Sequence, residues 1–336
     1  MMKVLHLPYG GQMVTLCSAL RDVGVEATSC HFERSNFRFA PDVCLDLQDV
    51  PPPGRGAVRQ QFFRWAVSEF DVFHFHCGLT FFPDHSDLEL LRKLGKKVVI
   101  QHRGSDVRRL SVARAFGNPY VQVKEPDEGR IVAKLQTLSA WIDHAIVADH
   151  ELLPYVKDFY KQVHLVRQAI DLKRFEPIYP SSADGSVPIV MHAPSHPIVK
   201  GTMYVRNAMW RLAREGVPFR FALLQKVPYE EAIRRYKQAD VIVDQLCIGS
   251  FGIVSLEGMA LGKPVVCYIR DGLRETYPED LPIVNADPKS LHETLRELLS
   301  KPERLRELGL RGRSYVERNH DSSVIAAQLA ELYRRL

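Results

Sequence analysis

The sequence predicts an α/β protein made of two Rossmann-like, doubly wound domains. The chain has 336 residues, more than one hydrophobic core usually organises, so two domains are expected. In both halves, short apolar runs alternate with segments of helical periodicity, which is typical of a parallel sheet covered by helices. A stretch rich in Pro, Ser and Gly, residues 175–186, lies between the halves and is interpreted as the linker.

The first half begins with a strand pattern at residues 3–7. Three further apolar runs, residues 72–75, 97–101 and 144–147, are expected to be buried strands of the same sheet. Residues 13–23 have helical spacing and follow Gly10 and Gly11. This glycine pair either bends the chain so that backbone amides approach a ligand, or simply makes a tight strand-to-helix turn.

The second half repeats the alternation after the linker. Its expected strands are residues 188–192, 219–224, 241–243, 264–268 and 282–284, with helices at 203–214, 229–237 and 254–261. The last stretch, residues 290–336, is helical by composition, with Arg and Glu pairs on solvated faces.

The composition excludes several classes of protein. Six cysteines are scattered without a CxxC pair or a His/Cys cluster at metal spacing, which favours reduced thiols in the cytoplasm. The sequence shows neither a signal-peptide pattern nor about 18 consecutive apolar residues, so we expect a cytoplasmic protein. A formal charge of +5 suits a phosphate-bearing ligand but is far from a nucleic-acid-binding signature.

The aromatic and basic segment at residues 55–70 leaves two interpretations open. It contains Arg59, Phe62, Phe63 and Trp65 among helical spacings. Such a stripe is typical of a helix packed on the core with solvated arginines. The alternative is an interfacial helix that contacts the inner face of a membrane as a peripheral partner.

Residues 239–266 carry the most informative pattern. They read as a strand, a glycine-containing loop, a helix with one embedded acid, and a Gly-Lys-Pro turn into the next strand. The loop residues Ser250, Phe251, Gly252 and Ile253 would present the free amides of a helix amino terminus, which attracts phosphate. Glu257 falls one turn inside that helix, where it can accept hydrogen bonds from ribose hydroxyls; an acid on an exposed helix face is the alternative.

This segment resembles the signature of the retaining GT-B glycosyltransferases of family 4, the glycosyl transferases group 1. Those enzymes place two glutamates eight positions apart around a Gly-Phe-Gly loop, followed by Glu-Ala-Met-Ala and Gly-x-Pro-Val. The residues that match are Phe251, Gly252, Glu257, Met259, Ala260 and the run Gly262-Lys263-Pro264-Val265. The first glutamate, which contacts the transferred sugar in the family, is replaced by Gly249, and Asp244 and Gln245 are candidate substitutes.

Further pieces resemble the family in the same order. The loop at residues 192–202 resembles the phosphate-binding loop that ends in Lys-Gly, so Lys200 is expected to neutralise the diphosphate and Ser195 to help bind the donor. The usual arginine of that loop is absent. The strand end at residues 71–76 resembles the family's Asp-x-x-His-x-His, in which the second histidine, here His76, orients the donor sugar. A histidine that satisfies a buried hydrogen bond is the alternative.

The strand end at residues 102–109 resembles the family's His-Gly-Ser-Asp loop with an arginine inserted. Arg103, Ser105 and Asp106 are therefore expected on the acceptor side, while Arg103, Arg108 and Arg109 form either a patch for an anionic acceptor or a solvated loop. Residues 168–175 resemble the run that introduces the second domain in these enzymes.

The resemblance implies a GT-B fold with two domains that face each other across a cleft. The expected parts are an acceptor-side domain at residues 1–175, a donor-binding domain at residues 176–313, and a terminal helix at residues 314–336 that crosses back to the first domain. The implied enzyme is a retaining glycosyltransferase of the hexosyltransferase type. Its catalytic residues are Lys200 and His76, and its donor-binding residues also include Gly10 and Gly11.

No cofactor or metal is expected, because no Asp-x-Asp motif sits in a plausible metal-binding loop. The partners are a nucleoside-diphosphate sugar and an acceptor that is a saccharide, a lipid-linked saccharide or a small molecule. A GT-B nucleotide-sugar epimerase and a non-catalytic nucleotide-sugar-binding relative stay open as alternatives. A nicotinamide dehydrogenase is disfavoured because Gly10 and Gly11 lack the GxGxxG spacing. The base, the sugar, the acceptor and the oligomeric state stay open.

Overall fold

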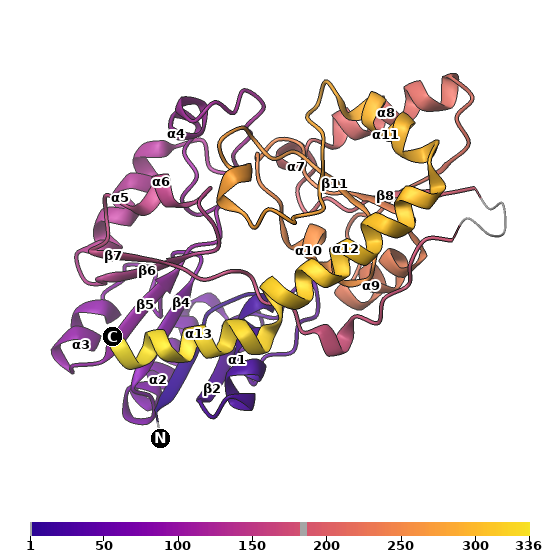
Figure 1. Ribbon diagram of the computed structural model, residues 1–336. Helices are drawn as coiled ribbons and strands as arrows, with labels where there is room; N and C mark the ends of the chain where they lie inside the picture. Colours follow the sequence, from indigo (N-terminus) through magenta and orange to yellow (C-terminus); the bar gives the residue numbers. More distant parts are fainter. Residues whose placement is uncertain (1, 182–186) are drawn as a thin grey trace. The chain divides into compact units, whose positions relative to one another are not determined.

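The computed structural model describes residues 2–181 and 187–336 and divides the chain into two compact units (Figure 1). Unit 1 comprises Met1–Arg109, Glu125–Asp171 and Ser322–Leu336, and unit 2 comprises Leu110–Lys124 and Leu172–Asp321. The boundary near Asp171 lies four residues before the expected one. Of the expected linker, residues 182–186 lie outside the described residues.

Unit 1 is built on a seven-stranded, wholly parallel sheet in the order β3-β2-β1-β4-β5-β6-β7. Its strands are β1 (Lys3–Leu7), β2 (Glu26–His31), β3 (Val43–Cys44), β4 (Val72–His76), β5 (Lys97–Gln101), β6 (His144–Val147) and β7 (Gln162–Leu165). Leu5 of β1 pairs with Thr28 on one side and Phe73 on the other. The four predicted strands are present, and the other three carry few large apolar residues.

The helices of this part of the chain are α1 (Gly11–Asp22), α2 (Pro52–Glu69), α3 (Asp87–Lys93), α4 (Leu110–Ala115), α5 (Glu128–Ser139), α6 (Leu153–Val156) and α13 (Ser322–Arg335). Of these, α4 falls in unit 2. In α2, Phe62 and Phe63 are buried while Trp65 is 44% exposed, so most of the aromatic stripe packs in the core. In Figure 1, α13 runs beside α1. Leu329 and Tyr333 of α13 belong to the same core cluster as Leu16 of α1.

Unit 2 has a five-stranded parallel sheet in the order β12-β11-β10-β8-β9. Its strands are β8 (Ile189–His192), β9 (Arg220–Leu223), β10 (Val241–Val243), β11 (Val265–Cys267) and β12 (Val284–Asn285). Its helices are α7 (Pro197–Lys200), α8 (Thr202–Arg214), α9 (Tyr229–Gln238), α10 (Ile253–Ala260), α11 (Leu291–Leu299) and α12 (Pro302–His320). Each predicted strand overlaps an observed one.

The terminal helix departs from its expected start. Helix α12 continues through Ser314 to His320, and the break falls at Asp321, where the backbone leaves the helical region. Helix α13 then packs in unit 1. None of the described helices is both long enough and apolar enough to cross a membrane.

Candidate active site

The first candidate site lies at the topological switch point of the sheet of unit 2. Strands β8 and β10 are neighbours, and the chain leaves them toward opposite edges of the sheet. Open α/β sheets bind ligands outside the carboxyl ends of such a strand pair. The loop after β8 leads to Lys200, and the loop after β10 leads to the amino terminus of α10, so the predicted donor-binding elements of this unit meet here.

Lys200 is the last residue of α7, and the turn that follows it is made by Gly201 at φ 75°. Its Nζ contacts Oε1 of Gln245 and lies 3.7 Å from Oδ1 of Asp244. Its carbonyl accepts a hydrogen bond from the amide of Leu246 at 3.1 Å. The side chain is 17% exposed, so its cation is held against the loop after β10 instead of extending into solvent.

Asp244 links this cation to α10. Its Oδ2 accepts hydrogen bonds from the amide of Gly252 at 3.0 Å and from Oγ of Ser255 at 2.7 Å. A Cβ on Gly252 would lie 3.2 Å from Asp244 Oδ2 and 3.3 Å from Lys200 Nζ, so the glycine permits this close approach. The next amides, of Ile253 and Val254, lie in the first helical turn and lack an intrahelical acceptor.

The four loop residues at 250–253, which were predicted to offer backbone amides to a ligand, do not all lie at the start of α10. Ser250 is buried, and its carbonyl accepts from Nε2 of Gln245. Phe251 is buried against Tyr277, with ring centroids 4.8 Å apart. Only Gly252 and Ile253 lie at the helix end. Ser195 is exposed in the loop after β8, three residues beyond the strand.

Glu257 lies one turn inside α10 and is buried, not on an exposed helix face. The hydroxyl of Tyr229, at the start of α9, donates to its Oε1 at 2.8 Å. Burial raises the pKa of Glu257 to about 8, although the Tyr229 hydrogen bond acts in the opposite direction. The guanidinium of Arg174 lies 5.4 Å from the centroid of the Tyr229 ring.

Gly249, which stands where the resembled family has its first glutamate, has φ 82°. A Cβ there would lie 3.1 Å from Nδ2 of Asn118 and 3.2 Å from Cβ of Arg270, so a larger residue would require the loop to shift. Asn118 Nδ2 donates to the carbonyls of Cys247 and Ile248, at 3.0 and 2.8 Å. The acid beside Lys200 is Asp244, supplied by the end of β10.

In unit 1, His76 belongs to a buried chain of hydrogen bonds. Arg103 Nη2 donates to His76 Nδ1 at 3.2 Å, so neutral His76 carries its proton on Nε2. That nitrogen then donates to His6 Nδ1 at 3.1 Å, and His6 Nε2 donates to the Tyr333 hydroxyl at 2.9 Å. The hydroxyl donates to His74 Nδ1 at 2.6 Å. Each of these four hydrogen bonds therefore has one donor and one acceptor when all of them run in the same direction, from Arg103 to His74.

Burial keeps these three imidazoles neutral. It lowers the pKa of His6 to about 3, with a smaller contribution from Arg103, and lowers the pKa of His74 and His76 well below its usual value. His76 is 1% exposed and uses both ring nitrogens within the protein. The arrangement matches the alternative of a satisfied buried histidine, and a contact with the sugar stays a prediction.

The nitrogens of His6, His74 and His76 lie within 4.8 Å of one another, a spacing compatible with a metal site. Nevertheless, the hydrogen bonds to Tyr333 and Arg103 and the bond between His6 and His76 already use five of the six ring nitrogens, and a metal would have to displace some of them. The donor set therefore fits a hydrogen-bonded network better than a metal centre.

The glycine pair after β1 serves packing and the turn. Gly10 has φ 123°, and its amide donates to Nε2 of His31 at 3.2 Å. A Cβ on Gly11 would lie 2.5 Å from the ring of Phe39. These contacts support the turn interpretation, since the Gly10 amide is already used.

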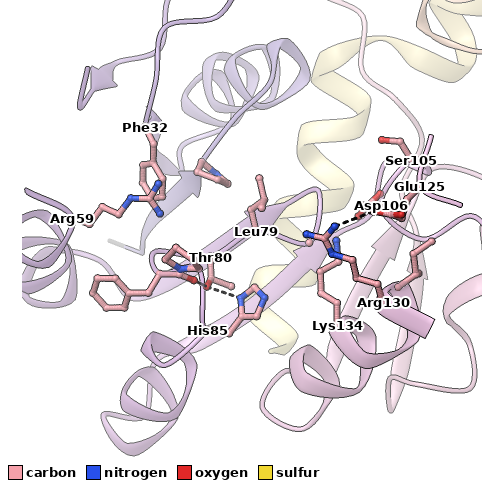
Figure 2. A pocket seen from close by; sticks show the side chains of 15 residues that line it. Phe32, Arg59, Leu79, Thr80, His85, Ser105, Asp106, Glu125, Arg130 and Lys134 are labelled. Atoms are coloured by element: carbon pink, nitrogen blue, oxygen red, sulfur yellow. Dashed lines mark hydrogen bonds and ion pairs between the residues drawn. The ribbon is translucent and has the colours of Figure 1, made fainter. Parts of the chain in front are cut away.

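The predicted acceptor-side residues separate in the structure. Arg103 points to His76 and Gln101, whereas Ser105 and Asp106 line a pocket of about 500 Å³ within unit 1 (Figure 2). Burial alone would raise the pKa of Asp106, but His102 and the amide of Arg103 outweigh it and lower the pKa to about 2. Lys134 also lines this pocket and was missed, although the i, i+4 pair Arg130 and Lys134 forms a basic face on α5.

Comparisons with known proteins agree with this architecture. Residues 213–315 match the family model described as Glycosyl transferases group 1. Sucrose-phosphate synthase from Thermosynechococcus elongatus superposes with a TM-score of 0.68 at 17% identity, covering 100% of this chain and 99% of that one. Anabaena HepE in complex with UDP-glucose superposes with a TM-score of 0.65 at 13% identity, covering 100% of both chains. The fold is GT-B.

Among curated proteins, the chain is similar to D-inositol 3-phosphate glycosyltransferase of Corynebacterium urealyticum. The two are 33% identical over 129 residues, which is 37% of this chain and 30% of the relative. The chain matches about a third of the length of such curated relatives. The family model and the curated relatives each match part of the chain, and the structural neighbours show the GT-B fold over all of it.

Proposed function

We propose that this protein is a retaining, metal-independent glycosyltransferase that transfers a sugar from a nucleoside-diphosphate donor to an acceptor hydroxyl. The observation that carries the proposal is the meeting of Lys200, the amino terminus of α10 and Glu257 at the β8/β10 switch point. A cation and unsatisfied amides suit a diphosphate, and a carboxyl group one turn further along, whose oxygens can accept hydrogen bonds, suits a ribose.

In the donor complex, the diphosphate would lie against Lys200 Nζ and the amides of Ile253 and Val254. Without ligand, Asp244 balances the charge of Lys200 and holds it close to α10. The ribose hydroxyls would donate to Glu257 in place of the Tyr229 hydroxyl, which is its partner in the structure. Tyr229 would then be released toward the bound nucleotide.

The reaction would break the bond between the anomeric carbon and the diphosphate oxygen and form a bond from the acceptor oxygen to the same face of that carbon. The acceptor proton would pass to the leaving diphosphate. Lys200 would stabilise the negative charge that grows on the diphosphate as the bond breaks. This course follows from the resemblance to family 4, in which the enzyme supplies no firmly established nucleophile.

The similar proteins support the donor class. The curated relatives are named glycosyltransferases. HepE was solved with UDP-glucose, and a further neighbour is an α-glucosyltransferase solved with UDP-glucose and DNA.

The proposal is tested by comparing Lys200→Ala with Lys289→Ala, which removes an exposed lysine of the same unit. Thermal-shift titration with UDP, GDP and ADP identifies the nucleotide, since a ligand that binds the folded state raises apparent stability. Hydrolysis of the matching sugar nucleotide then measures turnover. We expect Lys200→Ala to remain folded and to lose about 10²- to 10³-fold in turnover, the range for one charge-stabilising donor.

Lys289→Ala is expected to match the wild type in both assays. Near-native turnover in Lys200→Ala would contradict the assignment. Conversion of the donor alone into an epimeric sugar nucleotide would indicate an isomerase, and nucleotide binding without any turnover would indicate a non-catalytic relative.

A further inference from the structure

The pocket of unit 1 that Ser105 and Asp106 line also contains two cationic side chains, Arg59 and Lys134, for which the described residues provide no ion pair. We propose that it binds an anionic, hydroxylated acceptor, such as a sugar or polyol that carries a phosphate. This inference rests on the proposed function, because it names the class of acceptor for the same reaction.

The position of the pocket favours ligand binding. Its walls come from segments that follow β1, β2, β4 and β5, from α2, which supplies Arg59, and from α5 with the residues just before it. Strands β1 and β4 are neighbours from which the chain runs to opposite edges of the sheet, so this pocket lies at the switch point of the sheet of unit 1. A volume of about 500 Å³ is within the range that holds small ligands.

Two cations of the pocket have no carboxylate of the described chain within ion-pair distance, although Asp106 interacts electrostatically with Lys134 and Glu33 with Arg59. Neither Arg59 nor Lys134 makes an ion pair among residues 2–181 and 187–336, although both line the cavity (Figure 2). Arg59 uses Nη1 for the carbonyl of Phe81 at 3.2 Å and lies 4.9 Å from the centroid of the Phe32 ring. Its other N–H groups remain for a ligand.

The acids of the pocket are already occupied. Asp106 accepts from Nδ1 of His102 at 2.7 Å and from the amides of Arg103 and Gly104 at 3.0 and 2.9 Å. Glu125 forms an ion pair with Arg130 at 3.4 Å and accepts from the amide of Asp127. Arg59 and Lys134 therefore provide the charge that an entering anion would meet.

Lys134 is held over the backbone that follows β4. An ideal Cβ on Gly78, which has φ 66°, would lie 3.0 Å from Lys134 Nζ. A side chain at this position would require the ammonium group to shift slightly. The glycine thus leaves the space in which Lys134 faces the cavity, and it does so at a backbone conformation that favours glycine.

The pocket also offers a site for a hydroxyl. Thr80 Oγ1 donates to Asp87 Oδ1 at 2.8 Å, and His85 Nδ1 lies 3.0 Å from the same oxygen. Because the Thr80 hydroxyl donates its hydrogen bond to Asp87, His85 Nδ1 must be the donor to Thr80 Oγ1. The other ring nitrogen of neutral His85, Nε2, then carries the lone pair. Burial, and then Lys134, lower the pKa of His85, which keeps it neutral and able to accept from a hydroxyl.

The experiment titrates the full-length protein with glucose 6-phosphate, glucose and inorganic phosphate by isothermal calorimetry. The variants are Lys134→Met and Arg59→Gln, which keep much of the apolar stem, and the control is Arg64→Gln. Arg64 is exposed on α2 and does not line the pocket, so its loss changes the net charge equally. Nucleotide affinity and melting temperature are measured for each variant as readouts of folding.

We expect glucose 6-phosphate to bind the wild type at least tenfold more tightly than glucose, with competition by inorganic phosphate. Its affinity should fall at least tenfold in Lys134→Met and Arg59→Gln but less than twofold in Arg64→Gln, while nucleotide affinity stays unchanged in all three.

Equal binding of glucose and glucose 6-phosphate, no binding of either, or an equal loss in Arg64→Gln would overturn the proposal. Failure of the wild type to bind any nucleotide would instead count against the donor site, so the two failures can be told apart.

Discussion

Glu257 is a buried acid whose hydrogen-bond partner is a tyrosine hydroxyl. A carboxyl group in this setting keeps its proton to a higher pH than in the unfolded chain. Binding of a ribose would have to replace the Tyr229 hydrogen bond with at least one other. In the proposed donor complex, Glu257 would therefore couple donor binding to its own protonation state.

The pH dependence of stability tests this description of Glu257. Its pKa is about 8 in the folded protein against 4.5 as the reference, so the unfolded state loses the proton first as pH rises. Its contribution to the free energy of unfolding is present below pH 4.5 and falls, by at most about 1.4 kcal/mol per pH unit, up to pH 8. Urea denaturation of wild type and Glu257→Gln between pH 5 and 8 measures the difference.

We expect the wild type to lose stability relative to Glu257→Gln as pH rises. The difference in unfolding free energy between the two proteins removes the contribution of the buried histidines, which both share. The depressed pKa values of these histidines make stability rise with pH, and they do so at lower pH. Parallel stability curves for the two proteins would show that Glu257 titrates normally.

Sequence reasoning could predict Lys200 and Glu257 as candidates because each lies shortly after a strand, Lys200 directly before Gly201 and Glu257 in the helix that follows Gly252. It could not find the contacts among Lys200, Asp244 and Gly252, because these depend on how two loops meet in space. The sequence shows only that Gly249 replaces the first glutamate of the resembled family. The structure shows in addition that the backbone at this position has a positive φ, which favours glycine and which a pattern of residue types does not reveal.

At the scale of elements, α13 is attached to the sheet of unit 1 by Tyr333. Its ring packs in the core, and its hydroxyl connects His6 on β1 with His74 on β4. Composition predicted helix at the carboxyl terminus, and the family resemblance placed the start of the crossing helix at Ser314, whereas the break falls at Asp321. A helix break made by backbone angles at one residue leaves little trace in periodicity, whereas long apolar strands such as β1 leave a clear one.

Tyr333→Phe is expected to destabilise the protein by about 1–3 kcal/mol, because two buried ring nitrogens lose their hydrogen-bond partner while the ring still fills its space. Guanidinium denaturation at pH 7.5, where the histidines are neutral, measures the change. The matched control is Tyr9→Phe, since Tyr9 is 43% exposed, and surface changes of this kind stay within about 0.5 kcal/mol. Equal effects of the two substitutions would argue against the buried network.

At the scale of the whole molecule, each unit carries one candidate site at the switch point of its own sheet. This division would let donor and acceptor be recognised by separate surfaces. The sequence predicted two domains and both sheets, but it assigned residues 110–124 to the first. That segment is short and lies between elements of unit 1, so only tertiary contacts reveal that it belongs to unit 2.

Hydrogen exchange with mass spectrometry can assign each ligand to its unit. We expect the nucleoside diphosphate with the largest thermal shift to protect the loops after β8 and β10 and the first turn of α10. The matching nucleoside without phosphates should protect these segments much less, because it lacks the groups that contact Lys200 and the helix amides. Protection confined to unit 1 would contradict the donor site.

The segment Leu110–Lys124, which contains Asn118 and belongs to unit 2, limits how the protein can be cut into separately expressed fragments. The polypeptide passes between units after Arg109, Lys124, Asp171 and Asp321, so neither unit is one uninterrupted stretch of chain. A fragment that starts at Leu172 would omit Asn118, and the Cys247 and Ile248 carbonyls would lose the amide that ties down the loop beside Lys200. Expression of a trimmed C-terminal piece would thus remove part of the scaffold of the very loop under investigation, whereas point substitutions in the intact chain leave that scaffold in place.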